Sequence, residues 1–169
     1  MDNQKIKKNI QLVIDGMGIA IFSKKAMENI QEGDNFFERE FSTPQKVAEH
    51  IRKGDIIGFN IGSSGKYNLH IRDGYPNENI LSDNSIAIRL ALNVIGNEIS
   101  FIDLYWLMEW SNYIPKEQQI VVDDGVYHVT VLTRRPSSGI LGNNQDIYIY
   151  LNKIENFPEL NWDGVPVLY

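Results

Sequence analysis

The sequence predicts a mainly β protein, folded as an antiparallel β-sandwich or a partly closed barrel with one short helix. Three observations lead to this fold class. Runs of β-branched and aromatic residues recur at intervals of about 10 residues, as they do in small all-β domains. Glycine, asparagine and aspartate separate these runs where turns are expected. A helical spacing of apolar residues is clear in one short stretch, at about 43–53.

The totals limit the class of protein. The chain has 169 residues and a formal net charge of −6. We expect one domain over 1–169. The acidic excess argues against a role that depends on binding nucleic acid. The sequence contains no cysteine, which excludes disulfides and thiolate chemistry and is compatible with a cytoplasmic location. No run approaches the roughly 18 apolar residues of a membrane span, so no membrane partner is expected.

The first expected elements lie between Ile10 and Phe22. Asp15-Gly16 stands between two apolar runs and predicts a β-hairpin, with a single strand that bears a glycine bulge as the alternative. Residues 24–41 are mixed in character and predict a loop or short helix over one end of the core.

The helix at about 43–53 has signals at both ends. Thr43 can cap its N-terminus, Pro44 suits the first helical position, and Gly54 can close the C-terminus. Val47 and Ile51, four positions apart, form its apolar stripe.

The middle of the chain predicts four strands. Asp55–Ile61 and Lys66–Arg72 flank a Gly-Ser-Ser-Gly loop. In the second of these, Asn68, His70 and Arg72 share the polar face. Ile86–Ile95 alternates most regularly, and the turn signal Gly96-Asn97 leads from it into Glu98–Leu104.

The remaining segments are an aromatic run, a meander and a tail. Residues 105–110 predict an extended strand that continues the preceding one, although their period also fits a helical turn. Gln118–Leu151 predicts a β-meander with a turn at Asp123-Asp124-Gly125. Residues 157–169 contain too much proline for a central strand and are expected to pack on the outside.

No motif dictates a chemistry. The stretch 58–66 lacks the first glycine of a phosphate-binding loop and the hydroxyl residue after its lysine. The histidines His50, His70 and His128 have no metal-ligand spacing, so neither a metal nor a cofactor is expected. Asp103, Glu109 and Asp146 are acids inside apolar runs, and alternation predicts that they face solvent.

Aromatic and arginine residues are the best candidates for contacts with a partner. Trp110 and Tyr113 lie where the polar Ser111-Asn112 pair signals an exit to the surface, and exposed aromatic residues commonly anchor interfaces. Arg134 and Arg135 open a polar loop rich in hydrogen-bond donors. We predict these four residues as partner-binding residues, with a core position as the alternative for Trp110 and Tyr113.

Four segments of the C-terminal third have a recognisable pattern: 124–130, 136–145, 147–152 and 162–166. In these segments the chain resembles small bacterial immunity proteins of the polymorphic-toxin kind. A Gly-x-Tyr-x-x-Thr strand near the end is also loosely similar to the competence nuclease inhibitor of bacilli, a β-sandwich. The resemblance implies a non-catalytic, cytosolic, β-rich inhibitor.

We therefore expect a non-catalytic immunity or inhibitor protein that binds a cognate bacterial protein, such as a toxin, and occludes its active surface. One alternative is a β domain that binds a carbohydrate or another small molecule in an aromatic-lined cavity. Another is a hydrolase in which His70 or His128 acts as the general base, which would need an acid or hydroxyl within hydrogen-bond reach in a pocket.

Overall fold

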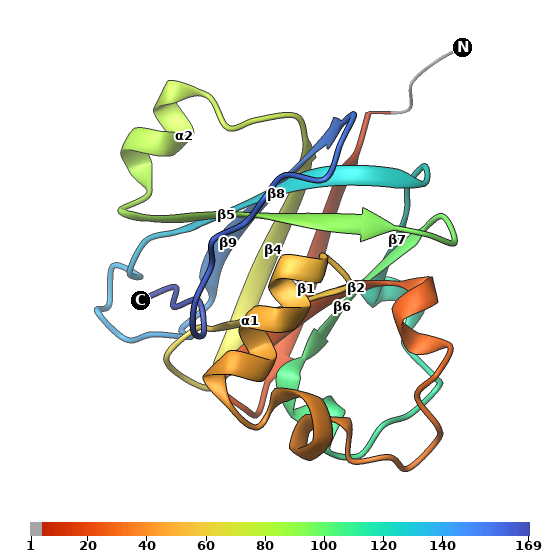
Figure 1. The fold of residues 1–169 in the computed structure, drawn as a ribbon. Coiled ribbons are helices and arrows are strands. Elements are labelled where there is room, and N and C mark those ends of the chain that lie inside the picture. Colours follow the sequence, from red (N-terminus) through yellow and green to blue (C-terminus); the bar gives the residue numbers. More distant parts are fainter. Residues whose placement is uncertain (1–4) are drawn as a thin grey trace.

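A computed structural model describes residues 5–169 and contains two β-sheets (Figure 1). Sheet A has five strands in the order β1 (Lys7–Ile14), β4 (Gly65–Asp73), β9 (Gln145–Ile154), β8 (Gly125–Thr133) and β5 (Ile86–Val94). Sheet B has four strands in the order β3 (Ile56–Asn60), β2 (Gly18–Ser23), β6 (Glu98–Asp103) and β7 (Gln119–Val121).

The helical elements are short. They are the helices α1 (Pro44–Lys53) and α2 (Glu78–Asp83), the 3₁₀ turns η1 (Lys24–Met27), η3 (Leu104–Met108) and η4 (Lys116–Gln118), and the π-helical turn η2 (Phe37–Phe41). The prediction for α1 is confirmed, because Thr43 accepts the Lys46 amide and Gly54 ends the helix at a φ of 72°. The sequence pattern does not predict α2, which Asn77 caps through the Ile80 amide.

The predicted fold class is confirmed. The inward faces of both sheets are apolar and form one core, as in a β-sandwich, and over residues 5–169 the sheets do not close into a barrel. On sheet A the inward rows include Ile10 and Leu12 of β1, Leu69 of β4 and Ile149 of β9, all buried. One pairing departs from the antiparallel expectation, because β4 and β9 run parallel.

The predicted hairpin at Asp15-Gly16 is wrong, and so is its alternative of one bulged strand. β1 pairs with β4, whereas β2 pairs with β3 and β6 in the other sheet. The loop 62–65 and the turn Gly96-Asn97 also join strands of different sheets. A turn signal shows where a chain reverses, but it does not decide whether the flanking strands pair with each other.

Two further expectations are corrected. Residues 105–110 are not a strand, since Asp103 caps the 3₁₀ turn η3 through the Tyr105 amide. Asp103 itself does not face solvent, because only 3% of its surface is exposed. The predicted meander is divided between the sheets: β7 belongs to sheet B, while β8 and β9 pair antiparallel in sheet A.

The C-terminal segment crosses the edge of sheet B. Asn60 of β3 donates its amide to Pro166 and accepts from the Leu168 amide, which forms a parallel bridge with Val167. Arg52 of α1 donates to the Trp162 carbonyl at 2.7 Å. The edge of β3 is therefore paired with the protein's own tail.

Candidate protein-binding surface

The outward side of sheet A carries polar and aromatic residues in rows. Strand pairing sets Arg72 beside Tyr150, Tyr150 beside Thr130, and Thr130 beside Arg89, so one row crosses four strands. The neighbouring row holds His70 and Tyr148. We call this surface the open face; its main residues are His70, Arg72, Arg89, His128, Thr130, Tyr148 and Tyr150.

One group of side chains on the open face forms a linked chain of contacts. Arg89 Nε donates to Thr130 Oγ1 at 2.9 Å, and the guanidinium lies over the Tyr75 ring at 4.7 Å from its centroid. The Tyr75 hydroxyl is 2.6 Å from His128 Nδ1. Burial, followed by the nearby charge of Arg89, lowers the pKa of His128. The lowered pKa favours the neutral form of His128 at pH 7, and the tautomer of the ring sets whether the Tyr75 hydroxyl donates to Nδ1 or accepts from it.

A second group lies on β4 and β9. His70 Nε2 is 2.8 Å from Asp146 Oδ1, and the imidazole stacks on Tyr148 with 4.7 Å between ring centroids. Arg72 Nη2 donates to Asn9 Oδ1 at 2.9 Å. These contacts fix the side chains before any partner arrives, which lowers the entropy cost of binding.

Arg134 and Arg135 lie where the open face meets the loop after β8. Both are exposed, and they line a hollow of about 510 Å³ together with Asp146. Beneath this rim, the buried Gln145 donates to Thr133 Oγ1 at 2.9 Å, and Thr133 donates to the Asp146 carbonyl at 2.8 Å. These bonds hold the ends of β8 and β9 together. The open face and its rim thus carry four arginines and one aspartate: Arg72, Arg89, Arg134, Arg135 and Asp146. This surface is basic, although the net charge of the chain is −6.

The structure does not bring the four predicted partner-binding residues together. Trp110 is 2% exposed, packs against Phe22 at a centroid distance of 5.8 Å, and donates to Asn112. Tyr113 is 75% exposed, but it lies on the segment between η3 and η4, next to sheet B. Only Arg134 and Arg135 border the open face.

The sequence does not predict the open face, because its rows of residues form only when strands that are distant in the sequence pair with each other. Asn68, His70 and Arg72 share a face by alternation, and so do Tyr148 and Tyr150. The sequence has no local signal that places β9 beside β4, because the paired residues are about 78 positions apart (His70 opposite Tyr148).

His70 and His128 satisfy part of the requirement for a general base. Each has a carboxylate or hydroxyl within hydrogen-bond reach. Both project from the outward face of a sheet, and neither lines the hollow at Arg134 and Arg135. Within residues 5–169, no group of three or more His, Asp and Glu side chains is arranged to hold a metal ion.

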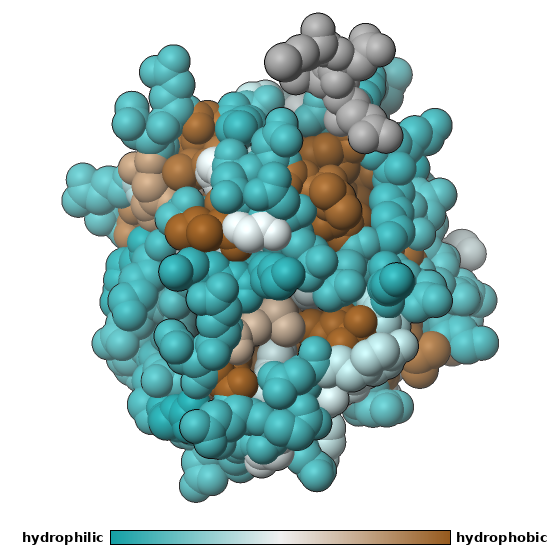
Figure 2. Space-filling model, turned by 90° about the vertical axis from the view of Figure 1, so that its right-hand side faces the viewer, coloured by the Kyte–Doolittle hydropathy of each residue, from teal (hydrophilic) through white to brown (hydrophobic). Residues whose placement is uncertain are grey.

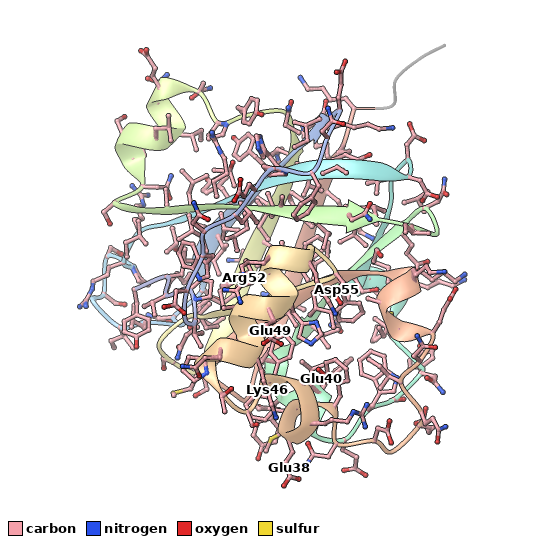
Figure 3. All side chains as sticks on the ribbon, in the orientation of Figure 1. Glu38, Glu40, Lys46, Glu49, Arg52 and Asp55 are labelled. Carbon is pink, nitrogen blue, oxygen red and sulfur yellow. The ribbon has the colours of Figure 1, made fainter. Side chains whose placement is uncertain are left out.

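His50 forms the most enclosed charged cluster. Its Nδ1 is 2.9 Å from Asp55 Oδ1 and its Nε2 is 3.2 Å from Glu40 Oε2, while its ring stacks on Phe41. Figure 3 labels Glu40 and Asp55, which approach from η2 and from the end of α1. Burial opposes protonation, but the hydrogen bonds and charges of Asp55 and Glu40 outweigh it and raise the pKa of His50. The cluster therefore joins η2 to α1 and has a structural role.

Comparison with known proteins supports the fold. No family model and no curated protein matches the sequence. Among solved structures, the chain is similar to ComJ from Bacillus subtilis, described as an inhibitor of the DNA-degrading activity of NucA. The TM-score is 0.55 at 15% identity, covering 89% of this chain and 99% of ComJ.

A second similar structure is described as crocagin biosynthetic gene J. It has a TM-score of 0.52 at 11% identity, over 86% of this chain and 97% of the other. The likeness to ComJ agrees with the fold that the resemblance to the competence nuclease inhibitor implies. Separately, none of the helices within residues 5–169 has the length and apolar character needed to cross a membrane.

Proposed function

We propose that this protein is a non-catalytic inhibitor of the immunity kind, which binds a cognate bacterial protein in the cytoplasm and occludes its active surface. One observation carries the proposal: the chain shares its fold with a nuclease inhibitor over nearly the whole length of both proteins. A toxin domain is the partner that fits the immunity role. The neighbour's target is not carried over, because 15% identity speaks for the fold alone.

The open face is the surface that best fits this function. It combines tyrosine and arginine, which are enriched at the centres of protein interfaces. Its side chains are already fixed by mutual contacts, and Arg134 and Arg135 supply charge at its rim. A partner with an acidic surface would be attracted to it and oriented by it.

The rival function of binding a small molecule receives less support. It predicts an aromatic-lined cavity, whereas apolar side chains of both sheets fill the core between them, and the hollow at the β7 end is lined mainly by lysines, acids and aliphatic side chains. The hydrolase alternative requires a histidine and its partner in a pocket, whereas His70 and His128 project from the outward face of sheet A and neither lines the hollow at Arg134 and Arg135.

The test is inhibition of the product of a neighbouring gene. That product is purified and its activity is measured as this protein is added in increasing amounts. We expect the activity to fall in proportion to the added protein and to vanish near equimolar amounts. If no neighbouring product loses activity or binds more tightly than about 1 μM, the inhibitor function is refuted.

A further inference from the structure

The two edges of sheet B differ in whether another segment pairs with them. The edge of β3 is paired with the C-terminal tail through Asn60. The edge strand at the other side is β7, and its exposed edge receives no such strand from residues 5–169. The side chain of Val121 at this edge is 84% exposed, although unpaired apolar edges are usually covered.

The backbone of β7 has an outward-facing amide and carbonyl at Val121, as the hydrogen bonds on either side of this residue indicate. The Gln119 carbonyl accepts a hydrogen bond from Lys8 Nζ at 2.5 Å, so it points away from β6. The Val122 amide donates in the opposite direction, to Asn97 beside β6, at 3.1 Å. Because backbone groups alternate along an antiparallel strand, the amide and carbonyl of Val121 point outward, as the Gln119 carbonyl does.

A groove runs beside this edge, between the ends of the two sheets. Its volume is about 960 Å³, and Ile6, Ile120 and Val121 contribute apolar surface. Figure 2 looks onto this side of the molecule and shows hydrophobic residues exposed between hydrophilic ones in its upper half. We call it the β7 groove.

Lysines dominate the charge of the β7 groove. Five of them line it, against three acidic residues: Lys5, Lys7, Lys8, Lys116 and Lys153 against Asp73, Glu98 and Asp123. Lys8 and Lys153 occupy core-facing register positions, opposite Ile71 and Tyr127. At this end of the sandwich, lysines therefore replace the apolar residues that fill the core elsewhere, and the space between the sheets stays open to solvent.

We propose that the β7 groove binds an extended acidic segment of a partner protein, which adds to sheet B as a strand beside β7. Backbone groups of the segment would pair with Val121, and alternate side chains would lie on the apolar floor or face the lysines. The positive charge selects acidic segments and repels basic ones. This inference goes beyond the inhibitor function, because the arginines of the open face do not line the groove.

The test is a titration of the full chain with a fluorescent synthetic peptide of alternating glutamate and valine, followed by anisotropy. A peptide with lysine in place of glutamate is the charge control. We expect saturable binding of the first peptide and none of the second. Lys116→Gln together with Lys153→Gln should weaken binding of the glutamate peptide about fivefold, because each substitution removes an exposed ion pair between a lysine of the groove and a glutamate of the peptide. Lys25→Gln with Lys53→Gln removes the same charge elsewhere and should leave binding unchanged.

The strand pairing is tested on the peptide, so that folding of the protein is not at issue. Methylation of alternate backbone nitrogens in the glutamate–valine peptide removes the donors for one edge. Methylation in the register that faces β7 should weaken binding roughly tenfold, and methylation in the other register should have little effect. Equal binding of both methylated forms, or of both lysine double variants, would overturn the proposal. The absence of saturable binding would overturn it as well. None of these three results would bear on the inhibition of a partner by the open face.

Discussion

The Asp103 carboxylate accepts a hydrogen bond from the Asp15 amide at 2.7 Å, across 88 positions of sequence. The same oxygen accepts from Gly16 at 3.2 Å, and the other oxygen accepts from the Tyr105 amide at 2.9 Å. Asp103 thus ties the connection between β1 and β2 to the end of β6. A single buried acid thus fixes one of the connections by which the chain passes from one sheet to the other.

Replacing Asp103 with asparagine should destabilise the fold. The amide nitrogen cannot accept a hydrogen bond, and the remaining bonds lose the charge of the carboxylate. We expect a loss of about 2–3 kcal/mol in the free energy of unfolding, measured by urea denaturation. The exposed Asp123 provides the matched control, for which Asp→Asn should change stability by less than about 0.5 kcal/mol. Similar effects at both sites would contradict the role of Asp103.

His50 should make stability depend on pH. Its pKa in the folded state is raised above the ordinary value near 6.5, so the folded protein holds this proton more tightly than the unfolded chain does. The stabilisation is fully present below about pH 6.5 and is lost as the pH rises through the folded pKa.

The measurement compares the free energy of unfolding of the wild type and of His50→Gln from pH 5 to pH 8. Both proteins retain His128, so the contribution of this histidine to the pH dependence cancels in the comparison. The stability difference between them should be largest at the acidic end and should shrink towards pH 8. A difference that stays constant, or grows with pH, would show that protonated His50 does not stabilise the cluster with Glu40 and Asp55.

Truncation of Trp110 should lower the stability of the fold far more than truncation of Tyr113. Trp110→Ala removes a buried ring that packs against Phe22 and should cost about 3–5 kcal/mol. Tyr113→Ala removes a side chain that is 75% exposed and should change stability by less than about 0.5 kcal/mol. Thermal unfolding of the two variants checks both values, and a stable Trp110→Ala protein would refute the core position of this ring.

Arg89 should control the titration of His128. Burial lowers the pKa of His128 most, and the Arg89 charge lowers it further. In Arg89→Gln the pKa should therefore rise towards the ordinary value without reaching it, as followed by NMR of the imidazole protons. Lys53→Gln removes a positive charge outside this cluster and should leave the pKa unchanged. An identical pKa in wild type and Arg89→Gln would mean that the two side chains do not interact as described.

The elements that depend on local chemistry could be predicted from the sequence. The caps Thr43 and Gly54 set the ends of α1, and the alternation of Leu90, Leu92 and Val94 matches the buried face of β5. Both signals act over a few residues. The fold class followed from the number and spacing of such runs.

The arrangement of strands could not be predicted in the same way. Asp15-Gly16 has the composition of a hairpin turn, yet Asp103 captures its amides and the flanking strands enter different sheets. Nothing near Tyr148 in the sequence shows that it will stack on His70. The open face is a product of pairing between distant strands, so the sequence led only to its rim, at Arg134 and Arg135.

The central claim is that the open face binds a cognate protein. The most direct measurement is calorimetric titration of this protein with the product of a neighbouring gene, using the wild type, Arg134→Ala with Arg135→Ala, and Lys25→Gln with Lys53→Gln. We predict a one-to-one complex tighter than about 1 μM, weakened roughly tenfold by the arginine substitutions and unchanged by the lysine substitutions. Equal affinity for all three proteins, or no binding to any neighbouring product, would contradict it.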